Sequence, residues 1–286
     1  MSVPLGLLAA ALASGLYNVG LLLQAVASRR GASRSAPRSR PAWSDASSCG
    51  VGGSPVGTGV SGWPLQAFAL TRAPLTVVQP VLGVGLVVPL IFGAPMLGDR
   101  VRRRDMLNVA ALIAGVSLLV AVAPPRKIDT TIDARLVIAL TALAVLIVAF
   151  LFLTVVLPGR RGSLLIAAAG IGFALSSMTT KLLADAATRH RWVLAAVWLA
   201  VTVISAAAAL IGEMNALQIR SAGAVSSLVF ALETVVPVGL SPLLFGETGN
   251  AGSGSLALRA CGLALAIAAA VALTRAPVVE HALAEE

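Results

Sequence analysis

Apolar runs of membrane length recur along this chain, and they limit its fold more than any other feature of the sequence. The clearest run covers about residues 136–157 and contains no charged side chain. A helix needs about 20 consecutive apolar residues to cross a bilayer. The chain is 58% hydrophobic and 12% charged, whereas soluble domains contain about 25% charged residues. The sequence therefore predicts an all-α integral membrane protein in contact with a lipid bilayer.

The chain also contains an internal repeat. Two apolar runs, each ending in a glycine followed by an acid, match at an offset of 148 residues. The matched positions are Arg72 with Arg220, Pro89 with Pro237, Gly98 with Gly246, and Asp99 with Glu247. A second match, at an offset of 157 residues, pairs Gly15 with Gly172 and Gln24 with Lys181. Because several positions share each offset, we interpret the chain as a duplication.

The apolar runs predict about nine spans in a 4+1+4 arrangement. They cover about residues 3–27, 49–71, 75–97, 106–123, 136–157, 163–184, 192–217, 221–245 and 256–274. The first repeat is then 1–124 with an Arg-rich insert at 28–48, a linking span lies in 125–162, the second repeat is 163–275, and 276–286 is a short acidic tail. Corresponding spans are five apart, so the two copies enter the membrane in opposite directions. Such inverted repeats are typical of secondary transporters.

The run at 49–71 is Gly-rich in its first half, and two arguments support it as a span. Its partner at 192–217 is strongly apolar. Without a span at 49–71, the two Arg-rich loops at 28–48 and 100–104 would also fall on opposite sides of the membrane. With nine spans, 13 of the 21 Lys and Arg residues fall on one side of the membrane. The positive-inside rule then predicts a plasma (inner) membrane protein with its N-terminus outside and its C-terminus in the cytoplasm. Lipid headgroups explain the basic loops better than nucleic acid does.

Ionisable side chains inside predicted spans are the first candidates for function, because a charge at membrane depth is costly. Glu233 lies in the middle of its span and is a candidate proton or cation site, and the same holds for Glu213 with Asn215 nearby. Alternatively, Glu213 lies at the headgroups or pairs with Arg220. Lys181 lies near the end of its span, where we expect the ammonium to reach the membrane surface; a counter-charge for a bound anion is the alternative.

Neutral polar residues and prolines form a second group of candidates. Each polar side chain either binds substrate or joins two helices; they are Gln66, Gln79, Asn18 and Gln24. Three prolines inside spans release backbone carbonyls, either at a solute site or at a packing kink; they are Pro80, Pro89 and Pro237.

The remaining residues are expected to be structural. Gly98 and Gly246 should close helices, with Asp99 and Glu247 bonding loop amides or a nearby arginine. We expect Gly83 and Gly85 to allow close helix packing. The tryptophans are expected to anchor the chain at the membrane interface; they are Trp43, Trp63, Trp192 and Trp198. The two cysteines and two histidines form no metal or disulfide motif, and we expect no cofactor and no enzymatic activity.

These features resemble a known group of proteins. The pattern Ala73-Pro74-Leu75, then Val78-Gln79-Pro80, a long apolar run and Leu97-Gly98-Asp99 is similar to the drug/metabolite transporter superfamily (EamA-like). Phe245-Gly246-Glu247 repeats its ending. The 4+1+4 count and the glutamine in the first span are similar to the NIPA-type magnesium transporter branch. The resemblance implies helical inverted repeats around a central solute site, often coupled to protons.

The function predicted from these observations is secondary transport of a small solute, a metabolite or drug, by alternating access between the repeats, with possible proton or cation coupling. A NIPA-like divalent cation (magnesium) permease is one alternative. A non-transporting membrane scaffold for envelope assembly is another. The sequence leaves the substrate, the direction of transport and a homodimeric state open.

Overall fold

The computed structural model describes residues 3–32, 55–86, 103–122, 132–217, 222–247 and 253–274. Every regular element in these ranges is a helix, as the sequence predicts. The α-helices are α1 (Val3–Ala32), α3 (Pro55–Arg72), α4 (Leu75–Gly83), α6 (Arg103–Ala121), α7 (Ala134–Val156), α8 (Arg161–Thr188), α9 (Trp192–Leu217), α10 (Ala222–Leu244) and α11 (Ser253–Thr274). Two 3-10 helices accompany them, η1 (Val84–Leu86) and η3 (Pro158–Arg160).

Several helices begin and end close to the predicted boundaries. The range of α9 is the predicted 192–217, and α7 differs from its predicted range by two residues at the start and one at the end. At the start of α7, Asp133 caps the helix, because its Oδ1 accepts a 2.9 Å hydrogen bond from the Leu136 amide. The apolar runs therefore locate most helices well.

The structure describes the predicted span at 75–97 only as far as Leu86. In this part, the α-helix α4 ends at Gly83 and the 3-10 helix η1 follows it. Gly83 and Gly85 flank this change, and glycine is a poor residue for the interior of a helix. Residues 87–102 of the predicted span and loop, which include Pro89, Gly98 and Asp99, lie outside the described residues.

Three helical stretches in the described ranges are long and apolar enough to cross a membrane. They are Ala134–Val156, Pro158–Thr188 and Trp192–Ala216. Shorter apolar stretches occur at Pro4–Val19, Met106–Ala121, Leu228–Leu244 and Leu256–Ala269. These lengths are compatible with a membrane protein, and the count of nine spans stays a prediction.

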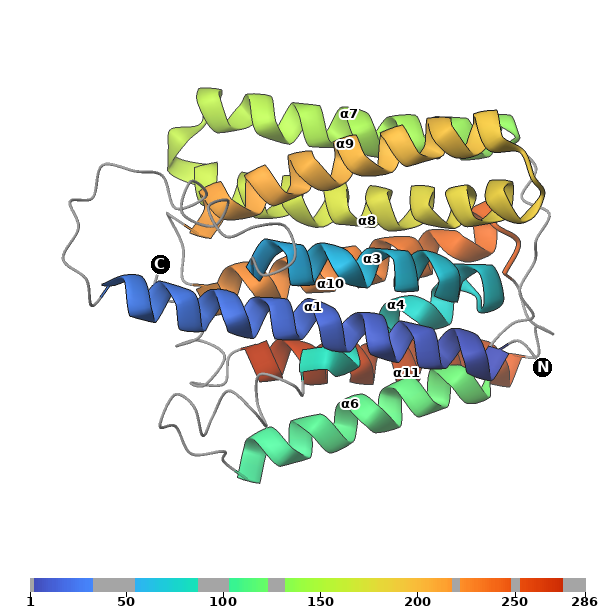
Figure 1. The fold of residues 1–286 in the computed structure, drawn as a ribbon, viewed down its shortest axis with the longest axis horizontal. Helices are drawn as coiled ribbons and strands as arrows, with labels where there is room; N and C mark the ends of the chain where they lie inside the picture. Colours follow the sequence, from blue (N-terminus) through green and yellow to red (C-terminus); the bar gives the residue numbers. More distant parts are fainter. Residues whose placement is uncertain are drawn as a thin grey trace.

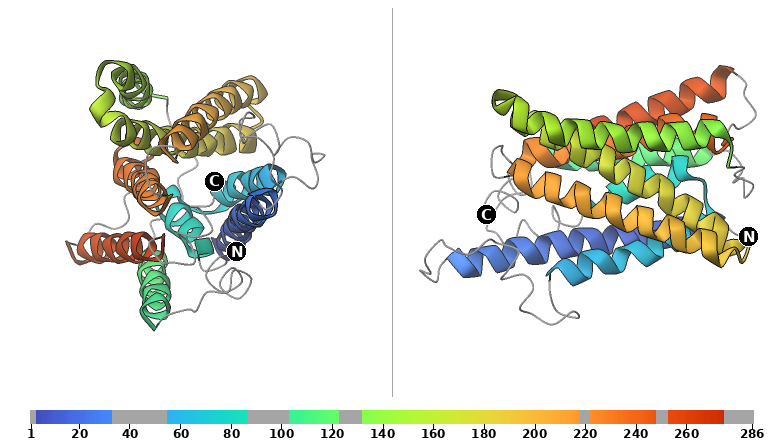
Figure 2. Two further views of the ribbon diagram at one scale, coloured as in Figure 1. Left: turned by 90° about the vertical axis from the view of Figure 1, so that its left-hand side faces the viewer. Right: turned by 90° about the horizontal axis from the view of Figure 1, so that it is seen from above.

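The helices form one elongated bundle in which they run roughly side by side (Figure 1). Helices α7, α8 and α9 lie along one side, and α6 and α11 lie along the other. Viewed along the bundle, α4 lies near the centre, between α10 and the α1–α3 pair (Figure 2). Consistent with this position, eight of the nine residues of α4 are buried.

Close packing at glycines holds the bundle together. A Cβ added at Gly83 would lie 2.5 Å from the ring of Phe230, and one at Gly85 would overlap side-chain atoms of Ser14 and Asn18. Both glycines therefore allow α4 and η1 to approach their neighbours, as the sequence predicts. Gly172 has the same role where α8 meets α9, because an added Cβ would lie 2.8 Å from that of Ala209.

A buried ion cluster and a row of unpartnered polar atoms

Lys181 lies inside the bundle, with none of its surface exposed. Its Nζ lies 3.3 Å from Oδ2 of Asp185, one turn later on α8, and 3.5 Å from Oε1 of Glu247, which follows α10. The ring of Phe245 lies 5.5 Å from the same nitrogen. A lysine is almost never fully buried unless it is paired. These contacts explain how α8 accommodates a positive charge among apolar helices.

Glu247 is also fully buried, and its carboxylate connects three parts of the chain. It accepts hydrogen bonds from the backbone amides of Leu75 (3.0 Å) and Thr76 (3.2 Å) at the start of α4. It also accepts a 2.6 Å bond from the Ser241 hydroxyl on α10. The first amides of a helix have no partner within the helix and carry partial positive charge, so a carboxylate stabilises them.

The geometry of the chain directs Glu247 toward α4. Helix α10 ends at Leu244, and Gly246 has a φ of 60°. This left-handed conformation suits glycine and turns the chain sharply after a helix. The glycine therefore closes the helix, and the acid after it bonds amides, although those amides belong to a helix from the first half of the chain rather than to a loop.

The expectation that Lys181 reaches the membrane surface is wrong. The helix α8 continues to Thr188, beyond the predicted end at 184, so Lys181 lies well within it. Sequence reasoning also missed Asp185, which is 5% exposed. Its spacing of four residues from Lys181 was an available signal, because side chains at i and i+4 of a helix are neighbours. No sequence signal linked either residue to Glu247.

A second group of polar residues lies between α1, α3 and α10. The Tyr17 hydroxyl donates a 2.7 Å hydrogen bond to Oε1 of Gln66, which is 6% exposed. Glu233 is half-buried in the middle of α10, within electrostatic range of Tyr17 and of Glu213 on α9. The structure therefore brings Gln66, Glu213 and Glu233 into one region, and it adds Tyr17, which the sequence did not single out.

Four buried side-chain atoms in the described part of the chain have no hydrogen-bond partner. They are Asn18 Oδ1, Thr76 Oγ1, Gln79 Nε2 and Thr234 Oγ1. Gln79 and Thr234 are each 1% exposed. Thr76 and Gln79 are three residues apart on α4, so they share one face of that helix, and α4 packs against both α1 and α10.

Prolines remove backbone hydrogen bonds from the same two helices. A proline cannot donate a hydrogen bond to the carbonyl four residues earlier. Pro80 in α4 therefore releases the carbonyl of Thr76, and Pro237 in α10 releases that of Glu233. The carbonyls that lose their helical donor thus belong to Thr76 itself and to Glu233, the residue before Thr234.

Other predicted site residues do not join these groups. The Asn215 amide nitrogen donates a 2.9 Å hydrogen bond to the carbonyl of Ile211 on its own helix. Arg72 is exposed, and its guanidinium lies 5.4 Å from the ring centre of Phe68. Gln24 lies in α1, but its side chain is outside the described residues, as is all of Arg220.

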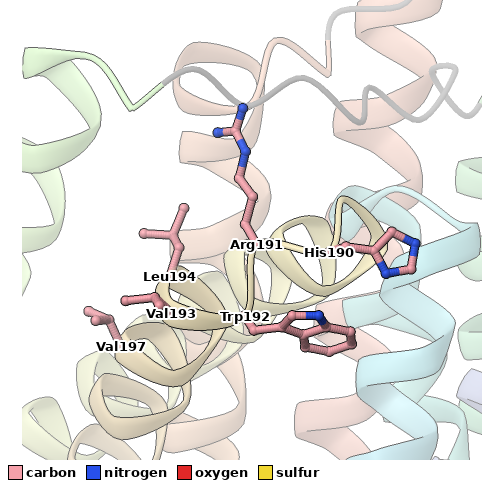
Figure 3. A pocket seen from close by; sticks show the side chains of 6 residues that line it. All are labelled: His190, Arg191, Trp192, Val193, Leu194 and Val197. Atoms are coloured by element: carbon pink, nitrogen blue, oxygen red, sulfur yellow. The ribbon is translucent and has the colours of Figure 1, made fainter.

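The described tryptophans lie in different surroundings, and their role at the membrane interface stays a prediction. Trp192 is exposed and lines an open hollow at the turn between α8 and α9 (Figure 3). In this view His190 lies beside Trp192, whereas Arg191 points away from both. Trp63 is instead half-buried and donates a 3.2 Å hydrogen bond to Thr180 on α8, and Trp198 packs against the core. Trp43 lies outside the described residues.

Within the described ranges, no three His, Cys, Asp or Glu side chains gather as metal ligands would. The candidate site therefore consists of the Lys181 cluster, the polar group around Glu233, and the unpartnered atoms along α4 and α10. In comparisons with known proteins, no family model, no curated protein and no solved structure matches this chain.

Proposed function

We propose that the chain is a multi-pass secondary transporter of a small polar solute, and that the solute passes along the contact between α4 and α10. The observation that carries this proposal is the set of unpartnered buried atoms on α1, α4 and α10. Each such atom destabilises a protein by about 1–3 kcal/mol. A transient partner, such as a solute in transit with its water, accounts for their retention.

The prolines inside α4 and α10 support the same path. Released backbone carbonyls within a membrane are tolerated only where protein or a water-lined cavity satisfies them. Secondary transporters place their sites near the midplane, at discontinuous helices. Here α4 and α10 each contain a proline inside the helix, they are the partners expected from the repeat, and they pack against each other.

Glu233 is the proposed coupling residue. Its half-buried carboxylate lies next to Thr234 and four residues before Pro237, within range of Glu213. A carboxylate in this position can exchange a proton or a small cation as the surrounding helices move. We propose that it binds the coupling ion, and that the solute contacts Gln79 and Thr234.

Alternating access between two inverted repeats completes the proposal. The packing of the described helices supports it, because α1 packs along α3 in the first repeat and α8 packs along α9 in the second. We place the protein in the inner membrane with nine spans, its N-terminus outside and its C-terminus in the cytoplasm, as the basic loops predict.

Binding can be tested on purified protein by thermal shift against amino acids, sugars, nucleosides, carboxylates, quaternary amines and Mg²⁺. A ligand that binds only the native state raises the melting temperature by mass action. Thr234→Val removes the unpartnered Oγ1 and Gln79→Leu removes the unpartnered Nε2, so neither variant should lower the melting temperature of the free protein by more than a loss of about 1 kcal/mol of stability would. Both should lose the shift that the bound solute produces.

Thr179→Val is the matched control. Thr179 is equally buried, but its hydroxyl bonds Thr202 (2.8 Å) and the carbonyl of Leu175 (3.0 Å). Its loss should lower the melting temperature and leave the ligand shift in place. A solute shift that survives unchanged in both Thr234→Val and Gln79→Leu contradicts the proposed path, and a shift with Mg²⁺ alone favours a divalent cation permease.

A further inference from the structure

The carboxylate of Glu247 connects the two halves of the chain at one end of the bundle. It bonds the first amides of α4, which belongs to the first half, and it pairs with Lys181 on α8 in the second half. The start of α4 and the chain after α10 lie at the end of the bundle where the N-terminus lies (Figure 1). Every bond in this connection is polar, so water that enters from this end competes with it directly.

Asp185 gives Lys181 a second partner on the same helix. Its Oδ2 lies 3.3 Å from Nζ, slightly closer than the 3.5 Å to Glu247. Separating a buried ion pair is unfavourable mainly because it leaves a charge without compensation. If Glu247 moves away, Lys181 keeps Asp185, and the released carboxylate and the α4 amides are hydrated at the opened end. An arrangement without Glu247 would therefore not leave the ammonium unpaired.

Gly246 places Glu247 on a turn rather than on a helix. With a φ of 60°, this residue carries the chain away from the end of α10. A side chain held by a turn can change position through a few backbone dihedrals, whereas a residue within α10 moves only with the helix. Glu247 therefore has the backbone freedom that such a movement needs.

We propose that Glu247 is a latch that holds this end of the bundle closed by joining α4 to α8, and that Asp185 takes over Lys181 when the latch opens. The latch rests on the proposed transport function for its purpose, since it would close one face of the solute path. Lys181 and Asp185 are positioning residues in this device, and they are not assigned contacts with solute.

The opening can be measured without knowing the solute, by the reactivity of a thiol placed beside the latch. Thr76→Cys, in a background of Cys49→Ser and Cys261→Ser, suits this purpose because the Thr76 hydroxyl has no partner to lose. Thr76 is 8% exposed, so the thiol should react slowly with a hydrophilic maleimide in nanodiscs, where both faces are accessible. Val229→Cys, in the second apolar cluster near the other end of α10, reports general loosening.

Glu247→Gln should raise the labelling rate at position 76 by about tenfold or more, because the isostere loses its ion pair with Lys181. Lys181→Met should raise it similarly. Asp185→Asn should leave the rate unchanged or lower it, since this variant keeps the latch and removes the alternative partner. The rate at position 229 should remain low in all three proteins.

Two results would overturn the latch. One is equal protection of position 76 in the parent and in both Glu247→Gln and Lys181→Met. The other is a parallel rise at positions 76 and 229, which indicates a purely structural role. A rise in Asp185→Asn as large as that in Glu247→Gln would overturn the role of Asp185. Because none of these rates depends on solute, a failed latch and a failed transport proposal give different results.

Discussion

Helices α7 and α8 follow each other in the chain and differ in what surrounds them. Only 22% of the apolar window of α7 is buried within the protein, whereas 78% of that of α8 is buried. The more apolar helix is therefore the peripheral one, and the helix with Lys181 and Asp185 is internal. In a soluble protein the more apolar helix is usually the buried one. The opposite order is expected when α7 faces lipid and the charged residues of α8 face other helices.

The charge on α8 should depend strongly on its partners. Lys181→Met leaves the carboxylates of Asp185 and Glu247 buried without their ammonium. Removing one member of a buried ion pair lowers the free energy of unfolding by about 3–5 kcal/mol, which can be measured by denaturation in mixed micelles. The double variant Lys181→Met with Glu247→Gln should recover part of the loss. A loss below about 1 kcal/mol in the single variant would contradict the buried cluster.

A lysine on the outer face of α7 should be unfavourable, although α8 holds a lysine inside the bundle. Val145 lies near the middle of α7 and is 59% exposed. In lipid, Val145→Lys should make membrane insertion less favourable by about 2.5–3.5 kcal/mol, which the inserted fraction of the chain reports. If this face contacted water, the same change would alter stability by at most about 0.5 kcal/mol. That result would show that α7 does not face lipid.

The glycines of α8 should tolerate change less than an equivalent glycine in the first repeat. Gly172→Ala places a Cβ 2.8 Å from that of Ala209, and overpacking of this kind destabilises by about 1–3 kcal/mol. Gly15 on α1, which the predicted repeat pairs with Gly172, has no atom within 4 Å of an added Cβ. Gly15→Ala should be neutral or stabilising by up to about 1 kcal/mol. Equal melting temperatures for the two variants would contradict the packing of α8.

The smallest effect on stability is expected when one lipid-facing apolar side chain of α7 is replaced by another. Val148 is 66% exposed on α7. Val148→Ala should change the free energy of unfolding by no more than about 0.5 kcal/mol. A loss of several kcal/mol would show that α7 packs against protein on this face, and the same denaturation experiment detects it.

The sequence predicts helix positions well because apolar runs and the charged residues between them are local signals. It does not predict the end of α4 at Gly83, since the apolar run that contains this position continues beyond it. The ion cluster is even harder to predict from the sequence, because Leu75 and Glu247 are 172 residues apart. Such a contact depends on how the two halves of the chain pack. The repeat identified Glu247 as notable but gave no indication of its partners.

The unpartnered atoms were predictable only in part. Gln79 and Asn18 stand out as polar residues in apolar runs, whereas Thr76 and Thr234 are inconspicuous by type. Whether a threonine in a helix bonds its own backbone, as Thr180 does, or stays unpartnered, as Thr234 does, depends on the neighbouring helix. The sequence therefore identifies the helices that hold the candidate path and not the groups that line it.

The most direct test of the account is solute flux in proteoliposomes that contain the purified protein, with a ligand from the thermal shift panel and an imposed pH or cation gradient. The wild-type protein should accumulate the solute along the gradient, and Glu233→Gln should remain folded but lose gradient-driven accumulation. Absence of flux for every ligand that binds, or equal accumulation by Glu233→Gln, would contradict it.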